Sequence, residues 1–533
     1  MQIEDVRQFE QNRVIDTELC IVGSGPAGLT IANEFAGTGV KVLILESGGL
    51  VEEPESDAQS EIESIGAPRV MEQTVVRNRI FGGSSHTWSG KCAPFDDIDF
   101  EARPWVPFSG WPICRANLNP YLDRAASYVG IAPRHDQHVW TLLGRPQPNP
   151  QVDTEILRPF FWQMSQDDSS SLDYAMRFGK RFLSSPATNV SILLHATVKH
   201  ITTNETGTQL TSVEVTNPEG GVIIVRPKAL VLCAGGIENA RLLLCSNRIV
   251  SEGVGNRNDL VGRFLMDHPR CILGEFALRH SKPLRYCYGL YRLNSEGRGR
   301  LFLHGLALSP KLQRKMQLLN CAAWLQDDKA FDDPWAAVKR LISGPDRHIM
   351  RDTWYFLSQP GLVVRGLGDR FIRRSGITRK IQRLFLHCIV EQRPDPESRI
   401  RLSDRKDKLG MPLPQLNWKI SDQEKATVAT FGKLIADEFK RIGLPGPELT
   451  EWVRSGRHDQ AEFIDVAHPS GTTRMARDPR EGVVDANCQV HGVDGVFIAG
   501  GSVFPTNGHA NPTLMIVALS IRLADRLKAQ YLR

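Results

Sequence analysis

The chain lacks most features that mark a secreted, membrane-spanning or nucleic-acid-binding protein. Its longest apolar runs, such as residues 514–519, are far shorter than the ~20 residues that cross a bilayer. The first 16 residues are polar and contain no apolar core of a secretory signal. Ten cysteines form no C-x-x-C pair, and a net charge of +5 leaves no dense basic footprint. We therefore expect a soluble, cytoplasmic protein with reduced thiols, no metal site, no nucleic-acid partner and no membrane insertion.

The chain does contain three strand–turn–helix units, each with a glycine-rich turn. They begin near residues 17, 229 and 495, and no internal repeat or low-complexity linker separates them. Valine-, isoleucine- and leucine-rich runs that end in glycine are typical of buried parallel strands. Residues 270–450 lack such units and mix short strand-like segments with aromatic residues. The pattern predicts an α/β fold (α+β overall) with a nucleotide-binding domain of residues 1–115, 180–270 and 455–533 and an inserted domain of residues 116–179 and 271–454.

The first unit carries a dinucleotide fingerprint. Gly23, Gly25 and Gly28 follow an apolar strand and open a helix, and Glu46 ends the next strand eighteen residues after Gly28. The glycines permit a tight turn, close approach of the backbone to a pyrophosphate, and close packing of helix on strand. A carboxylate at Glu46 can accept hydrogen bonds from ribose hydroxyls. The fingerprint predicts dinucleotide binding but does not separate FAD from NAD.

Five further motifs stand in order along the chain. They are Arg-Ile-Phe-Gly-Gly-Ser-Ser-His-Thr-Trp-Ser-Gly at 79–90, Ala-Gly-Gly-Ile-Glu at 234–238, Gly-Arg…Asp-His-Pro at 262–269, His-Pro-Ser-Gly-Thr-Thr-Arg-Met at 468–475, and Gly-His-Ala-Asn-Pro-Thr-Leu at 508–514. Together they resemble the glucose–methanol–choline (GMC) oxidoreductase family. The resemblance implies a Rossmann-like FAD-binding domain and an inserted substrate domain built on an antiparallel sheet.

The resemblance also assigns residues to the cofactor. The FAD-binding set is Gly23, Ser24, Gly25, Gly28, Glu46, Ser47, Arg79, Gly82, Gly83, Ser84, Thr87, Trp88, Ser89, Val198, Ala234, Gly235, Gly501, Pro512 and Thr513. Relatives with covalently bound flavin have the linking histidine immediately before the tryptophan, where this chain has Thr87. Here the histidine is His86, and adjacent residues of an extended loop point in opposite directions. We therefore expect non-covalent FAD.

The two catalytic positions of the family fall on His468 and Asn511. An alcohol gives up hydride readily only when its hydroxyl proton can leave, and a histidine with an ordinary pKa of about 6.5 can accept that proton. The amide of Asn511 can hold the same oxygen. Asn511 before Pro512 is also a good helix start, so capping alone would explain it.

The resemblance is strongest to the pyranose-oxidase branch and to bacterial enzymes that oxidise the 3-hydroxyl of glycosides, including C-glycosides. The expected substrate is thus a sugar or glycoside, and the acceptor is molecular oxygen or another oxidant. His509 could face the substrate or the core, and Gln392 could line the site or lie at the surface. Four hypotheses compete with sugar oxidation: oxidation of a non-sugar alcohol, a non-redox GMC-fold lyase, a flavin-binding module without catalysis, and an NAD-dependent dehydrogenase. The last two fit the His468 segment and the five motifs poorly.

One stretch stays outside these predictions. Residues 365–383 carry seven basic side chains and one acid. Such a stretch is either a solvated helix face or a contact with a partner or lipid.

Overall fold

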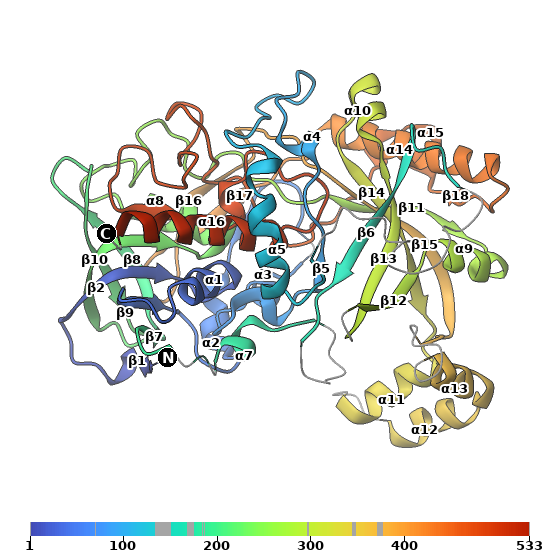
Figure 1. Cartoon of the computed structure of the whole chain (residues 1–533), viewed down its shortest axis with the longest axis horizontal. Helices are drawn as coiled ribbons and strands as arrows, with labels where there is room; N and C mark the ends of the chain where they lie inside the picture. Colours follow the sequence, from blue (N-terminus) through green and yellow to red (C-terminus); the bar gives the residue numbers. More distant parts are fainter. Residues whose placement is uncertain are drawn as a thin grey trace.

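A computed structural model of the chain describes residues 2–69, 71–133, 151–167, 175–183, 185, 187–295, 298–343, 348–369 and 377–531 (Figure 1). Arg370, Arg373 and Arg374 of the basic stretch lie outside these residues. Two large sheets divide the described chain, one on the left of Figure 1 and one on the right, each with its own hydrophobic core. The predicted α/β class with an inserted antiparallel domain is confirmed.

The first sheet is mostly parallel and holds the N-terminal strand–turn–helix unit. Its order is β1-β7-β3-β2-β10-β9-β8, with β19 beside β10. The bounds are β1 Gln2–Asp5, β2 Arg13–Val22, β3 Val42–Leu45, β7 Val190–Leu194, β8 Thr197–Thr203, β9 Leu210–Thr216, β10 Val222–Leu232 and β19 Val496–Ile498. All four residues of β3 are buried, as are the last four of β2. Such strands, covered on both faces, explain the continuous apolar runs in the sequence.

Helices cover this sheet and start at the ends of its strands. They are α1 Pro26–Glu34, α8 Gly235–Cys245 and α16 Thr513–Tyr531. Helix α1 follows β2, α8 follows β10, and α16 follows the loop after β19. Because parallel strands all end at the same edge, the N-termini of these helices meet on one side of the sheet.

The second sheet is antiparallel and forms the right half of Figure 1. Its order is β18-β11-β15-β14-β13-β6-β5, with β12 beside β13. The bounds are β5 Lys91–Cys92, β6 Leu157–Met164, β11 Arg270–Phe276, β12 Leu290–Ser295, β13 Arg298–Leu308, β14 Cys321–Lys329, β15 Ile381–Val390 and β18 Glu448–Leu449. Helix α14, Asp422–Arg441, packs on it, and Phe276 stacks on Phe439 with ring centroids 6.1 Å apart.

Two segments predicted for the inserted domain pack against the first domain instead. Helix α5, Asn119–Tyr128, buries Leu122 and Ala125 against the first core and packs on α16, and Arg124 pairs with Asp525 at 2.5 Å. A small third sheet of β4 Glu63–Ser64, β16 Arg399–Lys406 and β17 Pro412–Asn417 contacts α8. Neither segment carries a glycine turn, so no local pattern places it with the nucleotide-binding units.

The remaining helices are short. They are α2 Pro54–Asp57, α3 Gln73–Val76, α4 Asp97–Phe100, α7 Phe178–Phe182, α9 Ser281–Cys287, α10 Pro310–Met316, α11 Pro334–Ser343, α12 Ile349–Leu357, α13 Pro360–Leu367 and α15 Glu451–Ser455. Helices α11–α13 form a separate group at the lower right of Figure 1. Three cations of the basic stretch form ion pairs, namely Arg379 with Asp333, Lys380 with Asp332 and Arg383 with Glu275. Among the described residues, no helix is both long and apolar enough to cross a membrane.

Candidate active site

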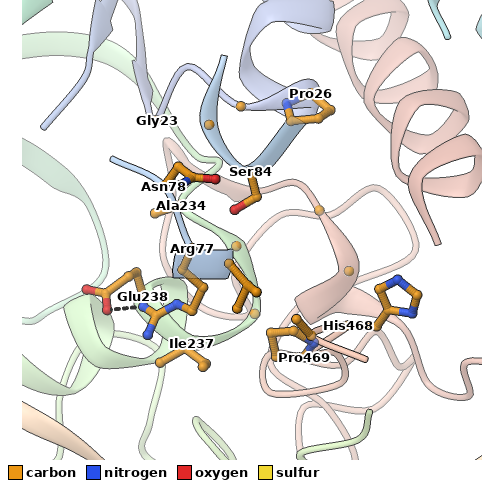
Figure 2. A pocket seen from close by; sticks show the side chains of 18 of the residues that line it. Gly23, Pro26, Arg77, Asn78, Ser84, Ala234, Ile237, Glu238, His468 and Pro469 are labelled. Carbon is orange, nitrogen blue, oxygen red and sulfur yellow. Dashed lines mark hydrogen bonds and ion pairs between the residues drawn. The ribbon is translucent and has the colours of Figure 1, made fainter. Parts of the chain in front are cut away.

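A cavity of about 540 Å³ lies where the two large sheets meet. One wall is made by the strand ends and helix starts of the parallel sheet, including Gly23, Ala234 and Pro512. The opposite wall is the face of the antiparallel sheet with Trp162 and Trp324. Figure 2 looks into this cavity and shows His468 and Pro469 on one side of it and the pair Arg77–Glu238 on the other.

The glycine fingerprint forms a cradle in the first wall. Gly23 has a φ of +97°, which L side chains rarely adopt. A Cβ on Gly25 would meet no atom within 4 Å, so the backbone there borders open space. A Cβ on Gly28 would lie 2.0 Å from the carbonyl oxygen of Gly23, so this glycine lets α1 pack on the turn. No side chain caps the first N–H groups of α1. Free N–H donors at a helix N-terminus beside an open glycine fit the pyrophosphate of a dinucleotide.

Glu46 lies at the end of β3 and is buried in the same wall. It accepts hydrogen bonds from the backbone N–H of Ser24 at 2.9 Å, from its hydroxyl at 2.5 Å, and from the N–H of Gly48 at 2.9 Å. These donors fix the carboxylate at the cavity edge, where its remaining lone pairs can accept hydrogen bonds from ribose hydroxyls. Ser24 itself is fully buried and acts through Glu46.

The glycine–serine loop covers the middle of the cavity. Gly83, Ser84, Thr87, Trp88 and Ser89 line it. The Trp88 indole donates to the carbonyl of Met176 at 2.7 Å, and the Thr87 hydroxyl donates to the side-chain oxygen of Asn78 at 2.7 Å. These bonds hold the loop in place over the cavity.

His86 points away from the cavity, toward Glu52, with 4.0 Å between Nδ1 and the carboxylate. Since Thr87 has no group that links to flavin, we predict that the flavin is released intact when the protein is denatured. The measurement is absorbance of the supernatant after acid precipitation. Flavin that stays in the pellet would contradict the prediction.

His468 and Asn511 meet at the wall of the cavity. The Asn511 amide nitrogen lies 3.5 Å from Nε2 of His468, and both residues border the cavity. His468 is held from behind, because its backbone N–H donates to Asp267 at 3.0 Å. Among the hydrogen bonds of the described residues, the Asn511 side chain bonds to the histidine and to no helix N–H. Helix α16 begins at Thr513, and the N–H of Ile516 donates to the Pro512 carbonyl.

A second histidine fixes which nitrogen of His468 is free. Nε2 of His268 lies 3.1 Å from the carbonyl oxygen of Asn507, which can only accept, so this nitrogen carries the hydrogen. Burial lowers the pKa of His268, so its Nδ1 is bare and accepts. Nδ1 of His468, 2.9 Å away, therefore donates to it. The lone pair of neutral His468 lies on Nε2, the nitrogen that faces Asn511.

The surroundings keep His468 uncharged. Burial, the neighbouring His268 and Lys91 lower its pKa to about 3, against the opposing influence of Asp267. The low pKa keeps the imidazole in the form that can accept a proton at neutral pH, although it also makes His468 a weaker base than an ordinary histidine. Asn511 beside it supplies a donor, so one hydroxyl group can bond to both.

A charged cluster borders the cavity opposite His468. Glu238 forms ion pairs with Arg77 at 2.5 Å and with Arg79 and Arg241 at 3.3 Å, and Arg241 also pairs with Asp407 at 2.7 Å. Although burial opposes it, the three guanidinium groups lower the pKa of Glu238 to about 2. Of these residues the sequence predicted only Arg79 as a site residue, because Arg77, Arg241 and Asp407 come from separate segments with no shared motif.

The structure brings most of the predicted residues to this one cavity. Its walls include Gly23, Gly25, Glu46, Ser47, Arg79, Gly83, Ser84, Thr87, Trp88, Ser89, Val198, Ala234, Gly235, His468, Gly501, Asn511, Pro512 and Thr513. Ser24, Gly28 and Gly82 lie behind the wall; the N–H of Gly82 donates to the Ser24 hydroxyl at 3.2 Å.

The two residues considered as substrate contacts lie elsewhere. His509 is 1% exposed and packs edge-on against Phe160 with ring centroids 4.5 Å apart. Gln392 is fully buried and accepts from the N–H of Asp267 at 2.7 Å and from the Trp418 indole at 2.8 Å. Neither residue borders the cavity.

Sequence reasoning missed the wall from the antiparallel sheet. Lys91, Trp162, Arg270 and Trp324 border the cavity there. Lys91 directly follows the glycine–serine loop, which is the one signal that pointed to it. The others come from strands whose register local patterns do not predict.

Comparisons with known proteins agree with this geometry. The models of the "GMC oxidoreductase" family match residues 180–270 and 394–520, and an "FAD binding domain" model matches residues 16–80. The structure of pyridoxine 4-oxidase from Mesorbium loti matches with a TM-score of 0.55 and 16% identity over 96% of this chain and 99% of that one, which shows a common fold.

Three curated relatives span different shares of the chain. The fructose dehydrogenase large subunit of Gluconobacter japonicus is 27% identical over a region that spans 60% of this chain and half of that protein. The 2-methyl-1,2-propanediol dehydrogenase of Mycolicibacterium austroafricanum is 23% identical over 97% of this chain and 96% of its own. A C-glycoside 3-oxidase of Microbacterium trichothecenolyticum is 34% identical over 25% of each chain.

Proposed function

Because the chain belongs to the GMC oxidoreductase family and is an FAD-binding oxidoreductase, we propose that it oxidises a secondary CH–OH group of a sugar or glycoside to the ketone, at the 3-hydroxyl. The observation that carries the proposal is the bare Nε2 of His468, which faces the cavity beside the Asn511 amide. The choice of a sugar is supported by the similarity to fructose dehydrogenase and C-glycoside 3-oxidase.

The chemistry of the residues that line the cavity suits FAD. The N-terminus of α1 with Gly25 would hold the pyrophosphate, Glu46 the ribose, and the loop at Trp88 the ring. When bound, FAD supplies the acceptor for a hydride. Molecular oxygen or another oxidant would serve as the final electron acceptor.

The chain's own residues act on the hydroxyl group of the substrate. Asn511 donates a hydrogen bond to the hydroxyl oxygen and thereby orients it toward His468. His468 accepts the hydroxyl proton at Nε2, which leaves the oxygen electrons free to form the carbonyl as the carbon loses its hydride. The proton on Nδ1 stays in the bond to His268, so the imidazolium is held in one orientation. The N-terminus of α16 turns its positive end toward the same part of the cavity and favours negative charge there.

The position of attack can be read from the product. We expect methyl β-D-glucoside to be converted into its 3-keto derivative, identified by NMR, and deuterium at C3 to slow anaerobic flavin reduction. A ketone at another carbon, with an isotope effect there, would replace the 3-hydroxyl assignment but keep the reaction. Rapid flavin reduction by a non-sugar diol, with no reduction by glycosides, would overturn the choice of sugar.

The low pKa of His468 predicts an unusual pH profile. A group whose pKa lies below 6.5 keeps its base form as the pH falls, so the anaerobic reduction rate constant should stay level from pH 8 to pH 5. A histidine of ordinary pKa would lose about thirtyfold between neutral pH and pH 5. Stopped-flow reduction by a neutral glycoside measures the profile. A tenfold loss per pH unit below 6.5 would contradict the proposed environment of His468.

A further inference from the structure

The wall of the cavity made by the antiparallel sheet is basic. In an antiparallel pair, residues directly opposite each other point to the same face, as do residues two apart on one strand. The register across β5, β6, β13, β14, β15 and β11 therefore puts five cavity-lining residues on a single face. They are Lys91, Trp162, Arg270, Trp324 and Ile389. This face carries two cations and, among its cavity-lining residues, no acid.

Lys91 is desolvated without an anionic partner. Its Nζ lies 4.1 Å from the ring centroid of Trp324 and 5.8 Å from that of Trp162. Within the described part of the chain, no carboxylate lies within ion-pair distance of it. Burial, followed by repulsion from Arg270, lowers its pKa to about 7. Two indole faces attract a cation but do not replace a counter-ion.

Arg270 and His387, on the same face, each have a buried side-chain nitrogen that makes no hydrogen bond with the described residues. The Nε of Arg270 is buried and makes no hydrogen bond with the described residues, and burial lowers the pKa of its guanidinium. His387 stacks on Trp324 with ring centroids 5.6 Å apart, and its Nδ1 is likewise buried without a partner among the residues described. Burial, Arg270 and Lys91 lower the pKa of His387 to about 4, so it stays neutral.

The other wall of the same cavity provides the contrast. There Arg77 and Arg79 pair with Glu238, and Arg241 pairs with both Glu238 and Asp407. On that wall, each of the three cations is thus paired with a carboxylate. Lys91 and Arg270 are half-buried. A charge withdrawn from water without a partner is costly to the fold, and a ligand of opposite charge would remove that cost.

We propose that Lys91 and Arg270 bind an anionic group of the substrate, a carboxylate or a phosphate ester, so that the preferred substrates are acidic sugars or glycosides. The inference rests on the proposed function and specifies its substrate class. Lys91 belongs to the strand that follows the loop at Trp88, and Lys91, Arg270 and His468 line the same cavity, so one substrate molecule could carry both the anion and the reacting hydroxyl. An Arg fork with a lysine beside it suits both carboxylate and phosphate.

The test compares matched probes on the holoenzyme. Methyl β-D-glucuronide and glucose 6-phosphate carry the anion, whereas methyl β-D-glucoside and methyl β-D-glucuronamide are neutral. We expect at least one anionic probe to reduce the flavin anaerobically with about 10–100-fold higher efficiency than its neutral counterpart. Whether the glucuronide or the phosphate is favoured distinguishes the two sources of charge.

Variants assign the preference to this wall. Lys91→Gln and Arg270→Gln should each lower the ratio of the efficiency with the anionic probe to that with the neutral glucoside about tenfold or more. The control is Lys228→Gln, which removes an exposed cation paired with Glu18 at 3.0 Å and should change neither rate. Lys91→Gln should also leave the melting temperature unchanged or raise it, because it removes a half-buried cation that has no carboxylate partner among the described residues.

Three outcomes would overturn the inference. Equal rates with anionic and neutral probes in the wild type would remove it and leave the proposed function intact. Equal losses for both probes in Lys91→Gln, with a lower melting temperature, would make Lys91 a structural residue. A flavin that no sugar reduces, charged or neutral, would remove the proposed function and the inference together.

Discussion

Replacing His468 by alanine is expected to slow flavin reduction by substrate about 10²–10⁴-fold, since that is the usual contribution of a general base. The imidazole is the only group beside Asn511 that presents a bare nitrogen to the reacting hydroxyl, within the residues described. The variant should remain yellow, because the cradle at Gly25 and the carboxylate of Glu46 do not depend on it. Anaerobic stopped-flow reduction measures the rate.

His86→Ala is the matched control for this variant. His86 is far from His468 in the sequence and does not line the cavity. Flavin reduction in His86→Ala should therefore proceed at the wild-type rate. Near-normal reduction in His468→Ala would show that another group takes the proton. Loss of the yellow colour in that variant would show that His468 supports cofactor binding rather than proton transfer.

The second large effect is expected at the glycine cradle, where one glycine-to-alanine substitution should weaken FAD binding and another should destabilise the fold. Gly25→Ala places a methyl group in open space, so the apoprotein should fold normally but bind FAD about 10–100-fold more weakly. Gly28→Ala places a Cβ 2.0 Å from the backbone carbonyl oxygen of Gly23, so the free energy of unfolding should fall by about 1–3 kcal/mol or more.

Two measurements separate these variants. The ratio of flavin to protein absorbance and the FAD dissociation constant report the cofactor, and the melting temperature of the apoprotein reports the fold. Full FAD occupancy in Gly25→Ala would contradict the placement of the pyrophosphate at this turn. A melting temperature of Gly28→Ala equal to that of the wild type would contradict the close contact of α1 with the turn.

The parts of the site that follow a local pattern were predictable from sequence. Gly23, Gly25, Gly28 and Glu46 are one strand–turn–helix–strand unit, so their spacing alone places them around a single turn. His468 and Asn511 come from two motifs, and the structure brings them within hydrogen-bond distance at the cavity. Their catalytic roles remain our proposal.

What depends on register and on long-range packing was not predictable. Lys91 and Arg270 face the cavity because of strand pairings across β5, β6, β13, β14, β15 and β11, and a shift by one residue would turn them to the other face. Only closeness in sequence to a motif or a strand points to His509 and Gln392 as substrate contacts. The structure buries both, because the chain turns between Asn507 and Asn511 and because Gln392 bonds to the backbone ahead of His268.

The role of His268 also emerged only from the structure. Its motif, Asp267-His268-Pro269, marked the segment, but 200 positions separate it from His468 in the chain. The backbone carbonyl of Asn507 fixes the hydrogen of His268, and through it the bare nitrogen of His468. The Asn507 carbonyl, His268 and His468 together determine which nitrogen accepts the proton, and no single sequence motif contains all three.

Oxidation of a CH–OH group of a sugar by this flavoprotein can be tested in a single sample. The most direct measurement is the absorbance spectrum of the purified protein before and after anaerobic addition of methyl β-D-glucoside, methyl β-D-glucuronide and a C-glycoside. We predict a yellow protein whose flavin band is bleached by at least one of them. A flavin band that none of these sugars bleaches would contradict the proposed activity. Bleaching by a different alcohol would then favour a non-sugar substrate, and no bleaching by any alcohol would favour a non-redox lyase.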